Sequence, residues 1–382
     1  MFEKINEKPF GELPEALVEG MLNQCHELGL NLSESFRKLY QSKTDMRSKI
    51  SEKDLLKRDV DISFIPSNPT TCAVDGSYAI ERLLYTDLIA FAGVAVEGLR
   101  PPSEKRYWPK PHHLSEILAI QHNDHTVLVA RAIMMCMELS LATEAPHDVV
   151  LFDGSLTTPL ISLDQALNRL NNVPTKLADL FENKIEEALV SYGKILSSKR
   201  TDKIFAGIPK YTTRKEISED ILGFEEYEDR GLLTFILEAG EFVGPVPIQK
   251  IRRPWHINLK PITLEVDQKG LVDEIISALN NLHIIYYRPY SHSPVLRIEV
   301  NKSIALNPNR LSILLESLRL QSSAPNILEP FPLYLADRMA KHLGTALPAI
   351  RRSTTQQISA EWEDKMGNTY LAMHGYRTNL GK

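Results

Sequence analysis

Cysteine is scarce in this chain of 382 residues, which contains only Cys25, Cys72 and Cys136. The three lie far apart and form no Cys-x-x-Cys pair, so the sequence indicates neither a zinc ribbon nor a disulfide framework. Such low cysteine use is typical of proteins in a reducing compartment. We therefore expect a cytoplasmic protein.

Long hydrophobic runs are also missing, so no membrane span is expected. The first residues, MFEKINEKPFGELPE, are charged and include no apolar signal region. The net charge of −5 excludes a uniformly basic nucleic-acid-binding coat but permits a local basic channel. Hydrophobic residues are 43% of the chain and charged residues 24%, a composition typical of soluble globular proteins.

Several catalytic signatures are absent from the sequence. Without a Walker A motif or a G-x-G-x-x-G motif, the chain is not expected to hydrolyse ATP by itself. The G-x-S-x-G elbow of serine hydrolases is missing as well. The histidines at positions 112, 113, 122 and 125 match no complete zinc signature, and we expect them on the surface.

The tripeptide Asp-Gly-Ser occurs twice, each time behind a short apolar run, at residues 75–77 and 153–155. Each run predicts a buried strand that ends at the aspartate, with the glycine allowing a sharp turn. A single Asp-Gly pair is more typical of an ordinary hairpin turn. Two carboxylates at the ends of neighbouring strands would instead share a hard divalent metal.

Glu138 supplies a third carboxylate, within an apolar segment predicted to be a helix over residues 126–144. Its helical face is shared by Met134 and Met135, so the carboxylate does not lie on a clean polar stripe. A buried, unpaired carboxylate costs several kcal/mol, which either a metal or a pairing with Arg131 would offset. Carboxylates without nearby thiolates favour Mg²⁺ or Mn²⁺ over zinc.

Cationic residues outside these motifs are candidates for phosphate contacts. Lys210 follows a predicted strand and Arg297 lies within another, and each would either neutralise a phosphate or pair with an acid. Arg252 and Arg253 lie next to Trp255, a combination found on surfaces that bind nucleic-acid strands. A solvated basic loop explains the same cluster equally well.

Strand and helix patterns alternate along the chain, with some adjacent strands forming hairpins. Helices are expected at 13–58, 115–122, 126–144, 270–281, 308–320 and 333–343. Strands are expected at 71–75, 86–96, 148–153, 203–209, 231–238, 246–251, 282–288 and 295–300. This order predicts an α/β fold, with a mixed sheet and helices on both faces.

An ordered set of motifs resembles the NurA nucleases. It consists of AVDGSY at 73–78, Glu138 in its long helix, VVLFDGSL at 149–156, IPK at 208–210, VLRIEV at 295–300 and EPFPLYLADRMAKHLG at 329–344. The resemblance implies an RNase H-like mixed β-sheet flanked by helices, over residues 66–345. A helical region over 1–65 and a C-terminal appendage over 346–382 would flank this nuclease domain.

The resemblance also implies which residues form the site. The catalytic residues and metal ligands would be four acids, Asp75, Glu138, Asp153 and Asp337. For Asp337 the alternative is a surface helix pair with Arg338. The expected DNA-binding residues are Lys210, Tyr78, Arg297, Arg252 and Arg253.

A protein with this resemblance is expected to be a metal-dependent DNA nuclease that hydrolyses phosphodiester bonds by a two-metal mechanism. It would hold two Mn²⁺ or Mg²⁺ ions per active site, form a homodimer and work with a HerA-type hexameric ATPase in DNA end processing or anti-phage defence. Two alternatives are a catalytically inactive subunit that clamps DNA for the ATPase, and a metal phosphatase that acts on small molecules.

Overall fold

A ten-stranded mixed sheet forms the centre of the protein in a computed structural model that describes residues 10–11, 13–62, 68–103, 105–224, 226–249, 253–362 and 366–377. The strand order is β1-β7-β8-β9-β6-β5-β2-β3-β4, and β10 pairs with β2. The strands are β1 (Leu56–Arg58), β2 (Thr71–Leu83), β3 (Asp87–Glu97), β4 (His112–Ile120), β5 (Val149–Phe152), β6 (Ile204–Gly207), β7 (Glu241–Pro247), β8 (Leu282–Arg288), β9 (Leu296–Asn301) and β10 (Gly375–Arg377).

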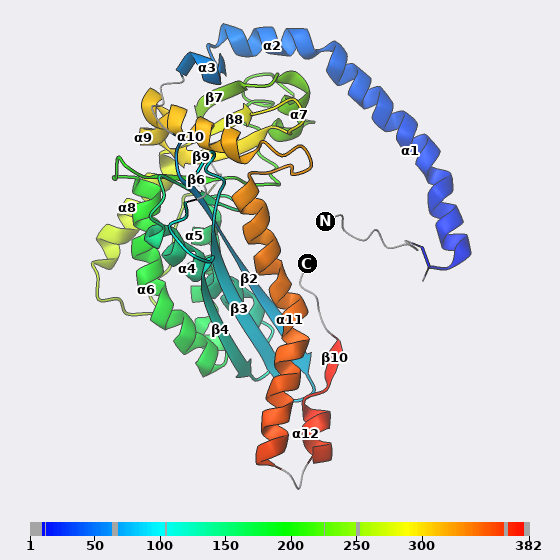
Figure 1. The fold of residues 1–382 in the computed structure, drawn as a ribbon, viewed down its shortest axis with the longest axis vertical. Helices are drawn as coiled ribbons and strands as arrows, with labels where there is room; N and C mark the ends of the chain where they lie inside the picture. Colours follow the sequence, from blue (N-terminus) through cyan, green and yellow to red (C-terminus); the bar gives the residue numbers. More distant parts are fainter. Residues whose placement is uncertain are drawn as a thin grey trace.

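Helices cover both faces of this sheet. They are α1 (Glu15–Gln41), α2 (Lys43–Glu52), α3 (Asp59–Ile62), α4 (Thr126–Glu144), α5 (Thr158–Leu167), the 3-10 helix η1 (Leu170–Asn172), α6 (Thr175–Ser197), α7 (Asp229–Ile236), α8 (Gln268–Asn280), α9 (Lys302–Ala305), α10 (Pro308–Gln321), α11 (Phe331–Glu361) and α12 (Met366–Ala372). In Figure 1, α11 crosses one face of β2 and β3, whereas α4 packs against these strands from behind and α6 packs against α4. The structure confirms the predicted mixed α/β sheet with helices on both faces.

Strands β2, β5 and β6 bring the two Asp-Gly-Ser motifs together. β2 pairs in parallel with β5 over residues 71–74, and β5 pairs in parallel with β6. The other edge of β2 pairs antiparallel with β3 over residues 72–82. Because parallel strands end at the same edge of a sheet, the residues that follow β5 and β6 lie beside the middle of the longer β2.

Two segments adopt the opposite state from the sequence prediction, while the strand expected at 246–251 overlaps β7 only at residues 246–247 and the helix expected over 13–58 ends before β1. Residues 115–122, predicted as a helix, belong mostly to β4, which pairs antiparallel with β3 and alternates between more and less exposed side chains. Residues 231–238, predicted as a strand, belong mostly to α7, whose Leu232, Leu233 and Ile236 are buried at helical spacing. In both segments the apolar residues suit either state, and packing against neighbouring elements decides between them.

The central helix α4 is apolar on nearly all sides. By length and composition it is the kind of helix that also crosses membranes, but 72% of its apolar window is buried inside the protein. It packs between β2, β3, α5 and α6. α4 is therefore a core helix, which explains its composition without a membrane.

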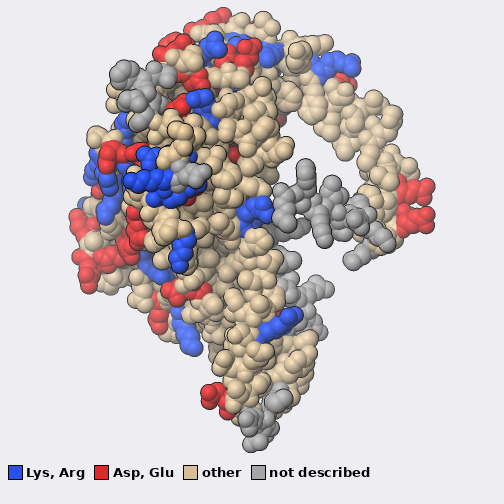
Figure 2. Space-filling model, viewed as in Figure 1, with Lys and Arg blue, Asp and Glu red and all other residues tan. Residues whose placement is uncertain are grey.

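Long helices lie near both ends of the described chain. In Figure 1, α1 projects from the body as an arm, and the face of this helix seen in Figure 2 is mostly uncharged, with charged side chains near its two ends. At the other end, the helix predicted over 333–343 is longer, because α11 continues to Glu361. The domain limits at residues 65 and 345 remain predictions, and the second lies within α11.

Candidate metal centre

Three carboxylates from distant parts of the sequence converge beside the middle of β2, where β5 ends. Asp75 lies on β2, Asp153 follows β5, and Asp337 lies on α11. One carboxylate oxygen from each lies within 4.8 Å of the other two. This spacing allows all three side chains to bind one hard cation.

The first Asp-Gly-Ser copy does not end its strand, contrary to the prediction. β2 continues to Leu83, because its pairing with β3 is unbroken across the motif. The pairing with β5 stops at Val74, so Asp75 lies just beyond the end of that neighbour. Gly76 provides space rather than a turn: a Cβ atom there would lie 2.7 Å from Glu138 Oε1 and 2.7 Å from Met134 Cγ.

The second copy behaves as predicted and turns the chain. β5 ends at Phe152, and Gly154 has a φ of +134°, which L side chains rarely adopt. Two hydrogen bonds hold the residues that follow. The Ser155 hydroxyl donates to Glu299 Oε2 at 2.6 Å, and the Leu156 backbone N–H donates to the same oxygen at 2.9 Å. Asp153 is therefore presented from a turn that a buried carboxylate on β9 anchors.

Glu138 points from α4 toward the same region and is only 8% exposed. The predicted alternative, a pair with Arg131, does not occur among the ion pairs of the described residues, and Arg131 is exposed. Glu138 lines a small cavity together with Asp153. Burial, followed by the charges of Asp75 and Asp153, raises the pKa of the Glu138 carboxyl well above its usual value.

Lys210 is the cation at the centre of the acidic cluster. Its Nζ lies 2.7 Å from Asp153 Oδ2, 2.9 Å from Glu329 Oε2 and 3.6 Å from Asp337 Oδ1. Arg230 donates a hydrogen bond to the Lys210 carbonyl oxygen and so fixes the backbone that carries this side chain. These ion pairs raise the pKa of Lys210, although burial opposes them.

Asp337 also forms an ion pair at 2.9 Å with Lys341, one helical turn away. Its alternative partner from the sequence, Arg338, instead donates to the Tyr334 hydroxyl at 3.0 Å. The side chain of Asp337 is 17% exposed, so it lies in the site rather than on an open helix surface.

Glu329 is a site residue that the sequence analysis missed. It lies just before α11 and joins the cluster through Lys210. Burial raises the pKa of its carboxyl, and Lys210 opposes this. The sequence offered one indication of Glu329: it is the first residue of the segment EPFPLYLADRMAKHLG and lies four residues before Leu333 of a predicted core helix.

The electrostatics of the cluster suit a divalent cation. Burial is the main cause that raises the pKa of Asp75 to about 8, and the charges of Asp153 and Asp337 add to it. The pKa of Asp153 is raised for the same main reason, while Lys210 opposes the shift. The clustered carboxylates therefore repel one another when they are ionised, more than one lysine offsets, and their oxygens fit Mg²⁺ or Mn²⁺ by chemistry and spacing.

A groove leads away from the cluster along the exposed side of α11. Its volume is about 650 Å³. Two acids of the cluster, Glu329 and Asp337, belong to its wall, and basic side chains continue it at Arg338, Lys341 and His342. The groove thus joins the carboxylates to a surface that suits an extended anion.

The other predicted DNA-binding residues do not join the cluster. Tyr78 is half-buried against the apolar core, on the opposite face of β2 from Asp75. Arg297 was wrongly assigned to DNA contact: it is 0% exposed and pairs with Glu216 at 2.7 Å and with Glu299 at 3.2 Å. Arg253 is exposed, and Arg252 lies outside the described residues.

Comparisons with known proteins agree with the fold. A scan of protein families matches the NurA domain over residues 69–342. A sequence search of curated proteins gives no match. The structure resembles the NurA nuclease from Sulfolobus solfataricus with a TM-score of 0.58 and 16% identity, covering 89% of this chain and 98% of that chain.

Two further NurA crystal structures share the fold. One gives a TM-score of 0.53 and 14% identity, covering 85% of this chain and 96% of that chain. The other, bound to dAMP and manganese, gives a TM-score of 0.50 and 15% identity, covering 87% of this chain and 97% of that chain. The expected mixed α/β fold class agrees with these structures, and the match over residues 69–342 shows that the chain belongs to the NurA family.

Proposed function

We propose that this protein is a nuclease that hydrolyses phosphodiester bonds in DNA and depends on Mn²⁺ or Mg²⁺. The observation that carries the proposal is the convergence of Asp75, Asp153 and Asp337 within 4.8 Å, beside the buried Glu138. The family assignment supports it, as does the manganese in a solved relative.

In this proposal each residue of the cluster has a defined task. Asp75, Asp153 and Asp337 hold the cation, and Glu138 completes a second position. When bound, two such ions polarise the scissile phosphate and lower the pKa of the attacking water. Lys210 holds its ammonium group among the acids and binds a phosphate oxygen when the substrate enters.

The groove along α11 then receives the DNA strand. Arg338 and Lys341 lie one turn or less from Asp337, so they neutralise phosphates next to the bond that is cleaved. The net charge of −5 makes such a local basic lining necessary, because the whole surface does not attract DNA.

The proposal is tested with Asp75→Asn, which keeps the shape of the side chain but removes its charge. With Mn²⁺ and single- or double-stranded DNA, we expect wild-type protein to release nucleotides and Asp75→Asn to lose activity at least about 100-fold. Asp45→Asn is the matched control, because Asp45 is an exposed residue on α2 that pairs only with Lys49 among the described ion pairs. Equal product from wild type and Asp75→Asn would contradict the nuclease proposal.

The proposed setting follows from the family resemblance. We propose a cytoplasmic homodimer that works with a HerA-type hexameric ATPase, in DNA end processing or in anti-phage defence. The main alternative is an inactive clamp on the ATPase. Calorimetry separates the two: a clamp would bind the ATPase and DNA but no Mn²⁺, whereas the nuclease proposal requires Mn²⁺ binding that Asp75→Asn weakens.

A further inference from the structure

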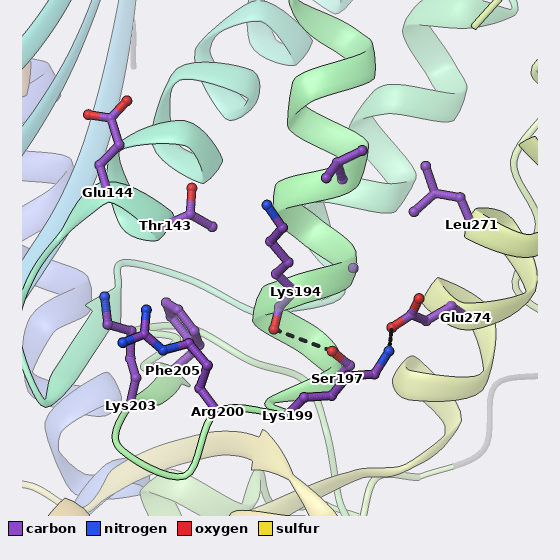
Figure 3. A pocket seen from close by; sticks show the side chains of 12 residues that line it. Thr143, Glu144, Lys194, Ser197, Lys199, Arg200, Lys203, Phe205, Leu271 and Glu274 are labelled. Carbon is purple, nitrogen blue, oxygen red and sulfur yellow. Dashed lines mark hydrogen bonds and ion pairs between the residues drawn. The ribbon is translucent and has the colours of Figure 1, made fainter. Parts of the chain in front are cut away.

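A second cavity, separate from the metal centre, lies between α6, α8, the end of α4 and the start of β6. Its volume is about 600 Å³, within the range of small-molecule sites. Figure 3 shows the ammonium group of Lys194 and the head groups of Arg200 and Lys203 directed toward the same open space. These cations come from two different elements, the end of α6 and the segment that leads into β6.

The position of this cavity excludes a role in the metal centre. Lys203 precedes β6, and the end of α4 leads into β5, so the cavity lies at the amino ends of these parallel strands. Asp153 and Lys210 follow the carboxyl ends of the same strands. A four-residue strand rises about 13 Å, and this length of sheet separates the two sites.

The cavity has positive charge that its own acids do not neutralise. Its two carboxylates are already occupied: Glu144 accepts from His112 at 2.9 Å, and Glu274 pairs with Lys199 at 2.6 Å. Across the part of the chain that the structure describes, neither Lys194 nor Lys203 forms an ion pair. The two ammonium groups are therefore available to an anion from outside.

Lys203 makes the strongest case for a bound anion, because its residue is only 4% exposed. Its Nζ donates to the carbonyl oxygen of Ala145 and lies 5.9 Å from the centre of the Phe205 ring. Burial lowers the pKa of this amine. A partly buried cation that contacts only neutral groups is costly, and an anionic ligand would offset that cost.

The rest of the wall is apolar or carries hydroxyl groups. Phe205, Val190 and Leu271 form the apolar part, and Thr143 and Ser197 contribute hydroxyls. An inorganic anion would leave the apolar part uncovered. A ligand that combines a phosphate with a flat apolar group would use both halves of the wall.

We propose that this cavity binds a nucleoside monophosphate, with its phosphate against Lys194 and Lys203 and its base against the apolar wall. The site is independent of the nuclease reaction. Its ligand is therefore distinct from the substrate of the metal centre.

Isothermal titration calorimetry of the full chain tests this proposal, with AMP as the probe and EDTA present to keep the acidic cluster free of metal. We expect AMP to bind more tightly than inorganic phosphate or adenosine. Lys194→Ala should weaken AMP binding at least about 10-fold, the effect of losing one charge-assisted hydrogen bond. Lys176→Ala is the matched control, since it removes an exposed lysine at the other end of α6 and should leave binding unchanged.

Three outcomes would overturn the proposal. They are the absence of AMP binding to wild-type protein, equal AMP affinity in wild type and Lys194→Ala, and inorganic phosphate that binds as tightly as AMP. Asp153→Asn locates the ligand: unchanged AMP binding supports the second cavity, whereas an altered affinity would place the nucleotide at the metal centre. None of these titrations measures DNA cleavage, so they test AMP binding even if the protein is not a nuclease.

Discussion

At the scale of single residues, Gly76 determines where the buried Glu138 carboxylate lies. We predict that Gly76→Ala destabilises the protein by about 1–3 kcal/mol, because the added methyl group would overlap Glu138 Oε1 and Met134 Cγ, both 2.7 Å away. The displaced carboxylate should also reduce nuclease activity, by more than the fraction of unfolded protein explains. Urea denaturation and a cleavage assay measure the two effects.

Gly29→Ala is the control for this substitution. A Cβ atom at Gly29 would meet nothing within 4 Å, and the residue lies in α1, where alanine favours the helix by about 1 kcal/mol. Stability should therefore stay equal or rise. If Gly76→Ala behaved like Gly29→Ala, the close approach of Glu138 to β2 would be wrong.

The raised pKa of Asp75 predicts a loss of stability as pH rises in the absence of metal. Its pKa is about 8 in the folded protein against 3.8 for the free side chain, so the folded state binds this proton more tightly. Raising the pH from about 4 to about 8 then favours the unfolded state, which releases the proton first. Thermal denaturation in EDTA should show this decline.

Asp75→Asn should remove part of the decline, because asparagine does not titrate. Mn²⁺ should reverse it in the wild type and bind more tightly as pH rises, since the cation competes with the proton. A metal-free protein with equal pH dependence in wild type and Asp75→Asn would contradict the raised pKa of this residue.

The site was partly predictable from the sequence because two of its acids, Asp75 and Asp153, follow recognisable apolar runs. Asp153 illustrates the favourable case, with a strand before it and a glycine after it. Glu329 illustrates the opposite case: its place in front of a proline-rich helix start does not indicate an ion pair, and only the fold brings it to Lys210. The prediction that Arg297 contacts DNA was wrong because the sequence does not show that Glu216, far away in the chain, pairs with it inside the core.

At the scale of elements, the same contrast explains which helices and strands were predicted. α4 was placed correctly because its nineteen residues form a long apolar segment that is rich in Ala, Leu and Met and contains no Pro or Gly. β4 and α7 were misassigned because each is short and rich in residues that suit both states. Pairing with β3 decides the first, and burial of the Leu232 side of α7 decides the second.

β9 positions the second motif through Glu299, which gives a prediction about an element away from the acids. Glu299→Gln removes the charge that accepts hydrogen bonds from Ser155 and Leu156 and pairs with Arg297 at 3.2 Å. We expect a stability loss of about 3–5 kcal/mol, because a buried arginine loses a partner. Activity should fall as well, through the turn that carries Asp153. Urea denaturation and a cleavage assay on the same samples measure both.

Glu316→Gln serves as the comparison, since its pair with Arg319 at 2.7 Å is on the half-exposed side of α10. Such a pair contributes about 0–1 kcal/mol. A Glu299→Gln protein as stable and as active as Glu316→Gln would show that β9 does not position the Asp153 turn.

At the scale of the whole molecule, α1 exposes an apolar surface that no packing within the single chain explains. Among the described residues, the C-terminal end of α1 contacts the body: Phe36 lies 5.6 Å from Phe235 between ring centres, and Leu39 joins the core. The rest of the helix exposes apolar side chains at helical spacing: Leu17, Met21, Leu28 and Leu32. Because an isolated helix is marginally stable in water, this stripe requires a partner, and the proposed homodimer supplies one.

This stripe predicts that the arm holds the dimer together. Leu28→Glu combined with Leu32→Glu places two charges in the stripe and should convert the dimer to a monomer, as light scattering coupled to size-exclusion chromatography would show. Leu30→Glu is the matched control: it changes an equally exposed leucine on the opposite side of α1, so the dimer should persist. The same double variant should keep the thermal stability of the body, since neither leucine belongs to its core clusters. A dimer that survives both changes would exclude the arm as its main contact, because buried glutamates in an apolar seam cost more than such an interface tolerates.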